Sequence, residues 1–207
     1  MAARPAAGGG RWVDVAPERL PRWLENFAAR HGDYTADGLH LVAADGATAE
    51  LQPPPGASGV RTIDGLRTGR YRIGLLLARK GAVAAGIADG DRLVSSKVDT
   101  HYVQGRTAAG GWSQQRFARR RDNQAKAAAA DGAAIVSRVL LPEVRTLAAL
   151  VCGGDQTAVD AILAAPVLAP LAALRADRLL DVPEPRHAVL VAAVAQARAV
   201  RILIREP

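Results

Sequence analysis

The residues best suited to take part in a reaction lie in a glycine-rich loop and directly after it. In order, they are two glycines, a tryptophan, a serine and two glutamines: Gly110, Gly111, Trp112, Ser113, Gln114 and Gln115. A glutamine amide has no useful pKa and cannot act as a general base. It can hold a water molecule and donate a hydrogen bond to a developing oxyanion. Glycines keep such a loop thin and allow positive φ angles. The pattern therefore allows water-dependent chemistry, although Gly-Gly before Gln is common and carries little weight alone.

Positive charge is concentrated in the same stretch. The chain has 207 residues, with 27 Lys and Arg against 20 Asp and Glu, a net charge of +7. The segment 104–126 alone contributes +5, because its basic residues are opposed only by Asp122: Arg106, Arg116, Arg119, Arg120, Arg121 and Lys126. Arginine and lysine donate to phosphate oxygens. The pattern indicates a directed basic surface for a polyanion, and a solvated helix face is the alternative.

The elements on either side must position this segment. The sequence predicts an antiparallel meander of about four short strands before the loop, at 71–78, 82–88, 92–97 and 100–104. Turns are expected at Lys80-Gly81 and around Gly90. After the loop the period becomes helical from about Gln114 to Leu140, and Pro142 ends the helix. Gly132 is a potential bend or break in this helix.

The C-terminal part alternates strands with helices. We expect an apolar strand at 146–152, a helix at 156–165 with Asp155 as its N-cap, a helix at 187–198 and a closing strand at 200–204. A meander followed by such alternation predicts one α/β domain, a mixed β-sheet with packed helices, over residues 61–207.

Residues 1–60 are expected to form a small addition. A mobile tail (1–10) and a short strand (11–15) precede an amphipathic helix that ends near His31. A hairpin follows around Asp45-Gly46. The proline-rich stretch 53–59 then reads as a linker or long loop.

Composition excludes several protein classes. The single cysteine, Cys152, rules out a disulfide framework or a cysteine zinc site and reads as a buried, inert thiol. The longest uncharged run has 14 residues, fewer than the ~20 that a membrane span needs. The N-terminus lacks the apolar core of a signal peptide. We expect a soluble, cytoplasmic protein without a metal, an organic cofactor or a nucleotide-binding glycine loop.

The order of these motifs resembles the catalytic middle domain of eukaryotic and archaeal peptide-chain release factors. It resembles more closely the bacterial branch of the Vms-like release factors, the peptidyl-tRNA hydrolases of ribosome rescue. The resemblance is strongest over residues 70–141. The matching residues, in chain order, are Leu75-Leu76-Leu77, Lys80-Gly81, Gly90-Asp91-Arg92-Leu93, Lys97-Val98, His101-Tyr102-Val103, Gly105-Arg106, the glycine–glutamine loop and Arg116-Phe117.

The loop departs from the release-factor pattern. Release factors carry Gly-Gly-Gln without interruption, whereas Trp112 and Ser113 intervene here. In Vms-like proteins two residues separate the glycine from the glutamine, which makes Gln114 the catalytic candidate and Gln115 the alternative by one register. Trp112 would be a stacking or docking residue or a core residue.

The family relationship implies hydrolysis of the ester that joins a nascent peptide to tRNA, on stalled or split large ribosomal subunits. Gly110 and Gly111 would shape the loop, and the basic residues, including Arg106 either at the loop base or on RNA, would dock on RNA. The alternative is a ribosome- or RNA-binding factor without catalysis. A metal-dependent nuclease built on Asp89, Asp91 and Asp99 is disfavoured, because two of these residues flank Gly90 in an ordinary turn.

Overall fold

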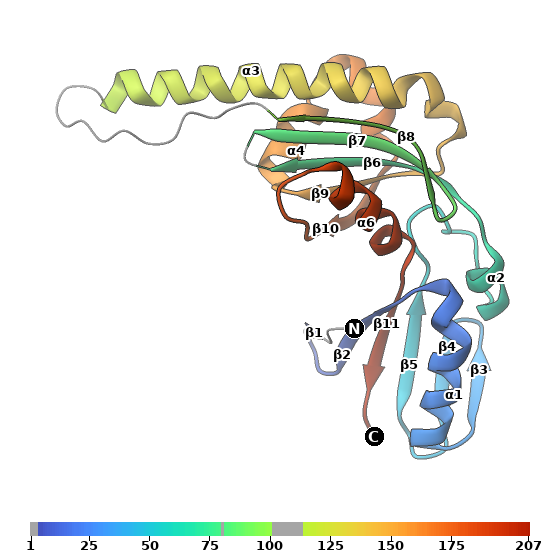
Figure 1. Ribbon diagram of the computed structural model, residues 1–207. Helices are drawn as coiled ribbons and strands as arrows, with labels where there is room; N and C mark the ends of the chain where they lie inside the picture. The colour runs from blue at the N-terminus through green and yellow to red at the C-terminus, as the bar shows by residue number, and fades with distance from the viewer. Residues whose placement is uncertain (1–3, 80, 101–113) are drawn as a thin grey trace. The chain divides into compact units, whose positions relative to one another are not determined.

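Two β-sheets organise the chain, one in each of two units (Figure 1). The computed structural model describes residues 4–79, 81–100 and 114–207, with the backbone alone at residue 100 and at 114–122. The first unit, here called unit 1, comprises Met1–Tyr71 and Ala195–Pro207, and unit 2 comprises Arg72–Val194.

Unit 1 is a six-stranded sheet with one long and one short helix. The strand order is β1-β2-β11-β5-β4-β3. The strands are β1 (Arg4–Pro5), β2 (Arg11–Val15), β3 (Tyr34–Asp37), β4 (His40–Ala43), β5 (Thr48–Gln52) and β11 (Val200–Arg205). The helices are α1 (Leu20–His31), after a 3-10 turn at Pro17–Arg19, and α2 (Ile63–Thr68). Helix α1 buries Leu20, Phe27 and His31, as its amphipathic spacing predicts.

The predicted hairpin of unit 1 is confirmed. Strands β4 and β5 pair antiparallel, and Gly46 between them has φ 93°, a conformation that glycine adopts freely. Asp45 fixes the turn, since its Oδ1 accepts a hydrogen bond from the Ala47 N–H at 2.9 Å.

The C-terminal strand corrects one prediction. Residues 200–204 are a strand, but β11 lies between β2 and β5 of unit 1 and pairs antiparallel with both, instead of closing the unit 2 sheet. Its alternate residues Val200, Ile202 and Ile204 belong to the unit 1 core. An apolar alternation predicts a strand with a buried face and does not identify its partner strand.

Unit 2 is a mixed five-stranded sheet in the order β10-β9-β6-β7-β8. Its strands are β6 (Arg72–Arg79), β7 (Ala82–Asp89), β8 (Arg92–Thr100), β9 (Ala149–Gly154) and β10 (Arg175–Leu180). β6, β7 and β8 form the antiparallel meander, and β9 and β10 run parallel to β6. The mixed α/β class is therefore confirmed. Strand β8 continues without a break from Arg92 to Thr100, where two strands were expected, because its polar residues are tolerated on an exposed sheet edge. Residues 101–104 lie outside the described residues.

Helices cover both faces of this sheet. They are α3 (Gln114–Leu140), α4 (Gln156–Leu163), α5 (Ala169–Ala172) and α6 (His187–Arg198), with 3-10 turns at Leu141–Thr146 and Pro166–Leu168. Ile87 of β7 belongs to the core that contains residues of α3 and α4. The adjacent Gly86 lies under Leu190 of α6, whose Cδ2 would be 2.9 Å from a β-carbon at 86. Because neighbouring strand residues point to opposite faces, α6 covers the face opposite α3.

Helix α3 is continuous through Gly132, so the helix does not break there. The N-cap prediction for α4 is confirmed, because Asp155 Oδ1 accepts from the Thr157 N–H at 2.9 Å. Across the described parts of the chain, no helix has the length and apolar character needed to cross a membrane.

Candidate functional site

The start of α3 separates the predicted site residues into two groups. Five of its residues fall outside the described residues: Arg106, Gly110, Gly111, Trp112 and Ser113. The other seven are placed on α3, within its first thirteen positions: Gln114, Gln115, Arg116, Arg119, Arg120, Arg121 and Lys126. The site is therefore described here by the two elements on either side of the loop, β8 and α3.

The loop leaves the sheet at a defined edge. Thr100, the last residue of β8, pairs with Ala82, which in turn pairs with Arg79 at the end of β6. Strand β8 runs in the same direction as β6, β9 and β10, so all four strands end at this edge. In α/β sheets, the carboxyl ends of parallel strands are the usual place for ligands.

Gln114 and Gln115 are the first two residues of α3. The N–H groups of a helix's first turn have no partner within the helix, and the helix dipole adds partial positive charge there. The glutamine pair therefore begins the helix at the end where backbone donors can stabilise a negative charge.

Helix α3 has an anchored half and a free half. Its C-terminal residues Ala133, Ile135, Val136 and Leu140 are buried in the unit 2 core. By contrast, residues 123–127 are all exposed. With 27 residues the helix is about 40 Å long. Figure 1 shows its N-terminal half running past the ends of the strands. We call residues 114–128 the arm.

Gly132 of α3 lies where there is no room for a side chain between the helix and its neighbours. A β-carbon at this position would lie 2.8 Å from Ile162 Cδ1 of α4 and 3.3 Å from Val83 Cγ2 of β7. The glycine thus lets the helix seat directly on α4 and the sheet. This contact fixes the C-terminal half of α3 against α4 and the sheet, because a packed interior resists displacement.

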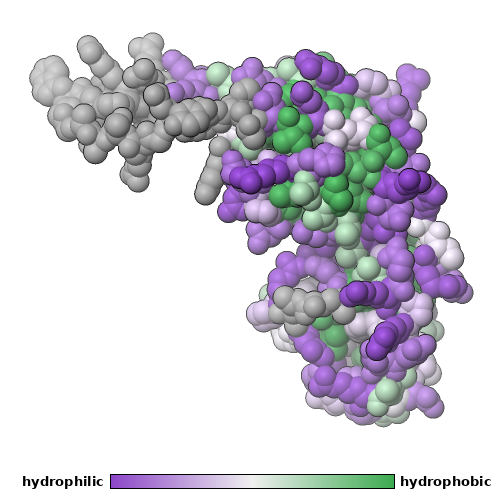
Figure 2. All heavy atoms as spheres, viewed as in Figure 1, coloured by the Kyte–Doolittle hydropathy of each residue, from purple (hydrophilic) through white to green (hydrophobic). Residues whose placement is uncertain are grey.

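Basic residues recur along the sequence of the arm. Positions 116, 119 and 120 share one side of the helix by their spacing, and 121 is next to them. Lys126 is exposed. Figure 2 shows the described part of α3 as hydrophilic residues alternating with weakly hydrophobic ones, in keeping with its mixture of alanine with Asn, Gln and Lys.

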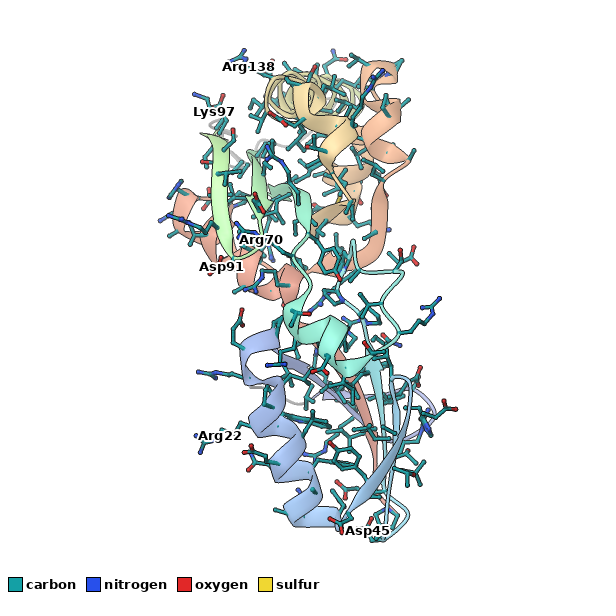
Figure 3. All side chains as sticks on the ribbon, turned by 90° about the vertical axis from the view of Figure 1, so that its right-hand side faces the viewer. Arg22, Asp45, Arg70, Asp91, Lys97 and Arg138 are labelled. Carbon is teal, nitrogen blue, oxygen red and sulfur yellow. The ribbon has the colours of Figure 1, made fainter. Side chains whose placement is uncertain are left out.

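Two further exposed basic residues lie on the same two elements, outside the segment singled out from the sequence. Lys97 of β8 and Arg138 of α3 are exposed, and Figure 3 shows both side chains directed away from the body of the molecule. The signal for Lys97 was its position three residues before the end of the strand that leads into the loop. The sequence alone did not show that β8 is an exposed edge strand.

Arg79 holds the neighbouring part of the same sheet edge. Its Nη1 donates to the carbonyl oxygen of Val182 at 2.7 Å and lies 3.9 Å from Asp181 Oδ1. Together with Pro183 and Glu184 these residues line an open pocket of about 430 Å³. Arg79 therefore fixes the segment that follows β10, beside the end of β6.

The acidic residues considered for a nuclease do not gather. Asp89 and Asp91 flank Gly90, which has φ 60°, in the turn at the start of β8, whereas Asp99 lies at the other end of that strand. Asp91 and Asp99 are eight residue steps apart along an extended chain, about 26 Å. Among the residues that the structure describes, no three His, Cys, Asp or Glu side chains form a group able to hold a metal ion.

Cys152 is buried, as expected for an inert thiol. Burial in the apolar core raises the pKa of its thiol to about 11, and Arg175 offsets only part of this. At neutral pH the group is therefore a protonated thiol, a poor nucleophile.

Comparison with known proteins gives a family match over the region that carries this site. The family model described as "Actinobacteria/chloroflexi VLRF1 release factor" matches residues 71–203. No curated protein matches the chain.

Two solved archaeal structures are similar in part. The crystal structure of the archaeal translation termination factor aRF1 shares 20% identity with a TM-score of 0.44, and the match covers 61% of this chain and 34% of that one. A structure titled "Archaeal protein" shares 16% identity with a TM-score of 0.43, and the match covers 76% of this chain and 51% of that one. The chain thus spans about a third and a half, respectively, of these two proteins.

Proposed function

Because the chain belongs to the actinobacterial and chloroflexi VLRF1 release factor family, we propose that it hydrolyses peptidyl-tRNA on stalled or split large ribosomal subunits. The family relationship itself implies a role in translation termination or ribosome rescue and an interaction with the ribosome. The hydrolytic activity, the substrate and the roles of individual residues are the proposal.

The observation that carries the proposal is the position of the glutamine pair at the first turn of α3. A water molecule held by the Gln114 amide attacks the ester carbonyl carbon. The bond from that carbon to the terminal ribose oxygen of the tRNA breaks, and the ribose oxygen takes up a proton. The N–H groups of the first helical turn, which have no partner within the helix, would stabilise the oxyanion that forms. Because an ester is intrinsically labile, positioning and electrostatic stabilisation can supply most of the acceleration.

The arm would deliver this chemistry. Its basic positions, Arg116, Arg119, Arg120, Arg121 and Lys126, lie on the helix that follows the loop, so they would contact RNA phosphates directly behind the glutamines. The thin glycine loop, with Gly110, Gly111 and Ser113, would enter a narrow RNA-walled cavity, and Trp112 and Arg106 would dock or orient it. The anchored half of α3, packed against the sheet, would support the arm while the tip is inserted.

The test is peptide release from stalled ribosome complexes in vitro by wild-type protein and by the Gln114→Ala and Gln115→Ala variants. We expect Gln114→Ala to lose release by about 10²–10³-fold, the usual cost of removing one oxyanion donor. Ribosome binding, measured by co-sedimentation, should be retained. Loss of release only in Gln115→Ala would move the role by one register. Release equal to that of an active wild type in both variants would overturn the role of the two glutamines. No release from wild type would favour a ribosome-binding factor without catalysis.

A further inference from the structure

Unit 1 contains a cluster of cationic side chains that converge on one carboxylate. Glu206, directly after β11, lies 3.3 Å from Arg11 Nη2 of β2 and 3.7 Å from Arg30 Nη2 of α1. Its Oε2 is also 3.8 Å from His31 Nε2. Three groups that can bind an anion therefore share a single acidic partner.

These three residues also line a pocket. It has a volume of about 130 Å³, and its walls are Arg11, Trp23, Asn26, Phe27, Arg30, His31 and Ile204. Small-molecule and cofactor sites usually span about 300–1,000 Å³, so this pocket suits one anionic group or one aromatic ring. Figure 3 shows α1, which supplies five of its residues, lying along the strands of unit 1.

Neighbouring residues hold His31 and Arg11 of the pocket in place. His31 is only 6% exposed, and its Nδ1 lies 2.9 Å from Asp45 Oδ2, so the turn of the β4–β5 hairpin orients the imidazole. Arg11 is set by strand pairing, since it lies opposite Ile204 on β11. The Nε of Arg11 is buried and, within the described part of the chain, has no hydrogen-bond partner.

Aromatic rings form the other wall. Trp23 and Phe27 stack with centroids 5.3 Å apart and planes 15° apart, and Trp23 is partly exposed. Arginines that bind phosphates next to an aromatic ring that stacks on a base are the combination that single-stranded RNA sites use. A guanidinium group can bind a phosphate with the same paired hydrogen bonds that it makes to a carboxylate.

We propose that this pocket is a second RNA-binding site, which takes one backbone phosphate on Arg11 and Arg30 with the adjoining base on Trp23, and that Glu206 occupies its mouth in the absence of RNA. The carboxylate of Glu206 and the side chain of Arg30 are 48% and 63% exposed. Ion pairs this exposed contribute little to stability, so a phosphate can displace Glu206 at small cost. This site goes beyond the proposed hydrolysis. It consists of unit 1 residues and includes no residue of the arm, and its test does not measure hydrolysis.

The experiment measures RNA binding with the full chain. The probe is a fluorescein-labelled oligouridylate about ten nucleotides long, near the length that one single-strand binding domain covers. Anisotropy titrations are made in a background with Arg119, Arg120 and Arg121 changed to alanine, so that the arm does not mask the second site. The Glu206→Gln variant removes the competing charge with little change in shape, and we expect about threefold to tenfold tighter binding. Adding Arg30→Ala to Glu206→Gln should abolish the gain.

The matched control is Glu25→Gln, on the side of α1 away from the pocket, which changes the net charge by the same amount. Thermal unfolding of each variant checks that unit 1 is intact. Equal affinity in Glu206→Gln, Glu25→Gln and the background protein would overturn the proposal. So would binding of an oligoglutamate peptide of similar length in place of the RNA. Neither readout depends on peptide release, so failure here is distinguishable from failure of the proposed hydrolysis.

Discussion

Gly132 of α3 and Ile162 of α4 lie in direct contact, because the space that a β-carbon at 132 would need is already filled by Ile162 Cδ1 and Cγ1, 2.8 and 3.0 Å away. At this contact α3 packs against the rest of unit 2. A change at this contact should therefore act on the orientation of α3 as well as on stability.

The first prediction concerns this contact. Gly132→Val should lower the free energy of unfolding of unit 2 by about 1–3 kcal/mol, because overpacking forces neighbouring side chains out of their rotamers. Urea denaturation followed by circular dichroism measures the change. The control is Ala134→Val, an exposed position on the same helix, which should cost less than about 0.5 kcal/mol. Equal midpoints for the two variants would show that the contact at 132 is not tightly packed.

The second prediction uses Cys152 as a reporter. Because burial raises the pKa of its thiol to about 11, the native protein should react slowly with a thiol reagent at pH 8. In urea the same thiol should react at the rate of a free cysteine. Gly132→Val should raise the rate under native conditions, since unit 2 then opens more often. Fast reaction of the folded wild-type protein would contradict the buried position of Cys152.

The third prediction concerns the salt dependence of ribosome binding. Changing Arg119 and Arg120 to alanine should reduce the slope of log affinity against log salt by about 1.5, since each phosphate contact contributes about 0.7–0.9. Co-sedimentation with large subunits over a range of salt concentrations gives the slope. The control double variant changes two exposed arginines outside the arm, Arg92 and Arg145. A similar loss of slope in both would mean that the basic arm has no special role.

The fourth prediction concerns acid stability of unit 1. The Ala47 N–H and then His31 hold the pKa of the Asp45 carboxyl below its usual range. A lowered folded-state pKa gives stability that is present above the unfolded pKa, about 3.9, and is lost as the pH falls through the folded value. Stability should therefore fall less between pH 5 and pH 3 in Asp45→Asn than in wild type. Tryptophan fluorescence in urea, measured in a Trp112→Phe background so that Trp12 and Trp23 report, follows unit 1. Asp33→Asn at an exposed position is the control. A wild-type pH dependence in Asp45→Asn would exclude this role.

Local signals in the sequence were reliable for individual elements. The hairpin at Asp45-Gly46, the N-cap at Asp155 and the helix from Gln114 to Leu140 follow from turn chemistry, capping and periodicity, each of which acts within a few residues. The site prediction also rested on short-range order, because the loop, the glutamines and the arginines are consecutive. The start of α3 at Gln114 agrees with the helix expected there, and the site itself stays a prediction.

Long-range relationships could not be predicted in the same way. Strand β10 has an Arg-Ala-Asp-Arg-Leu-Leu sequence that lacks strand periodicity, and pairing with β9 makes it a strand. The strand at 200–204 was found, but its neighbours are 145 or more residues away in the sequence. Gly132 was interpreted as a potential bend or break. The need for glycine there comes from Ile162 of α4, a contact that the local sequence does not reveal. Arg11, Arg30 and Glu206 are brought together only by the completed sheet of unit 1.

The position of β11 has a consequence for the protein's own synthesis. Unit 2 is continuous in the chain, whereas the central strand of the unit 1 sheet is made of residues 200–205, after every residue of unit 2 has been polymerised. During translation, therefore, the unit emerging first must wait with an open gap between β2 and β5, while the inserted unit can already fold. Unit 1 can therefore complete its sheet only after unit 2 has been synthesised, so the codons of β11 set the earliest time at which unit 1 can close.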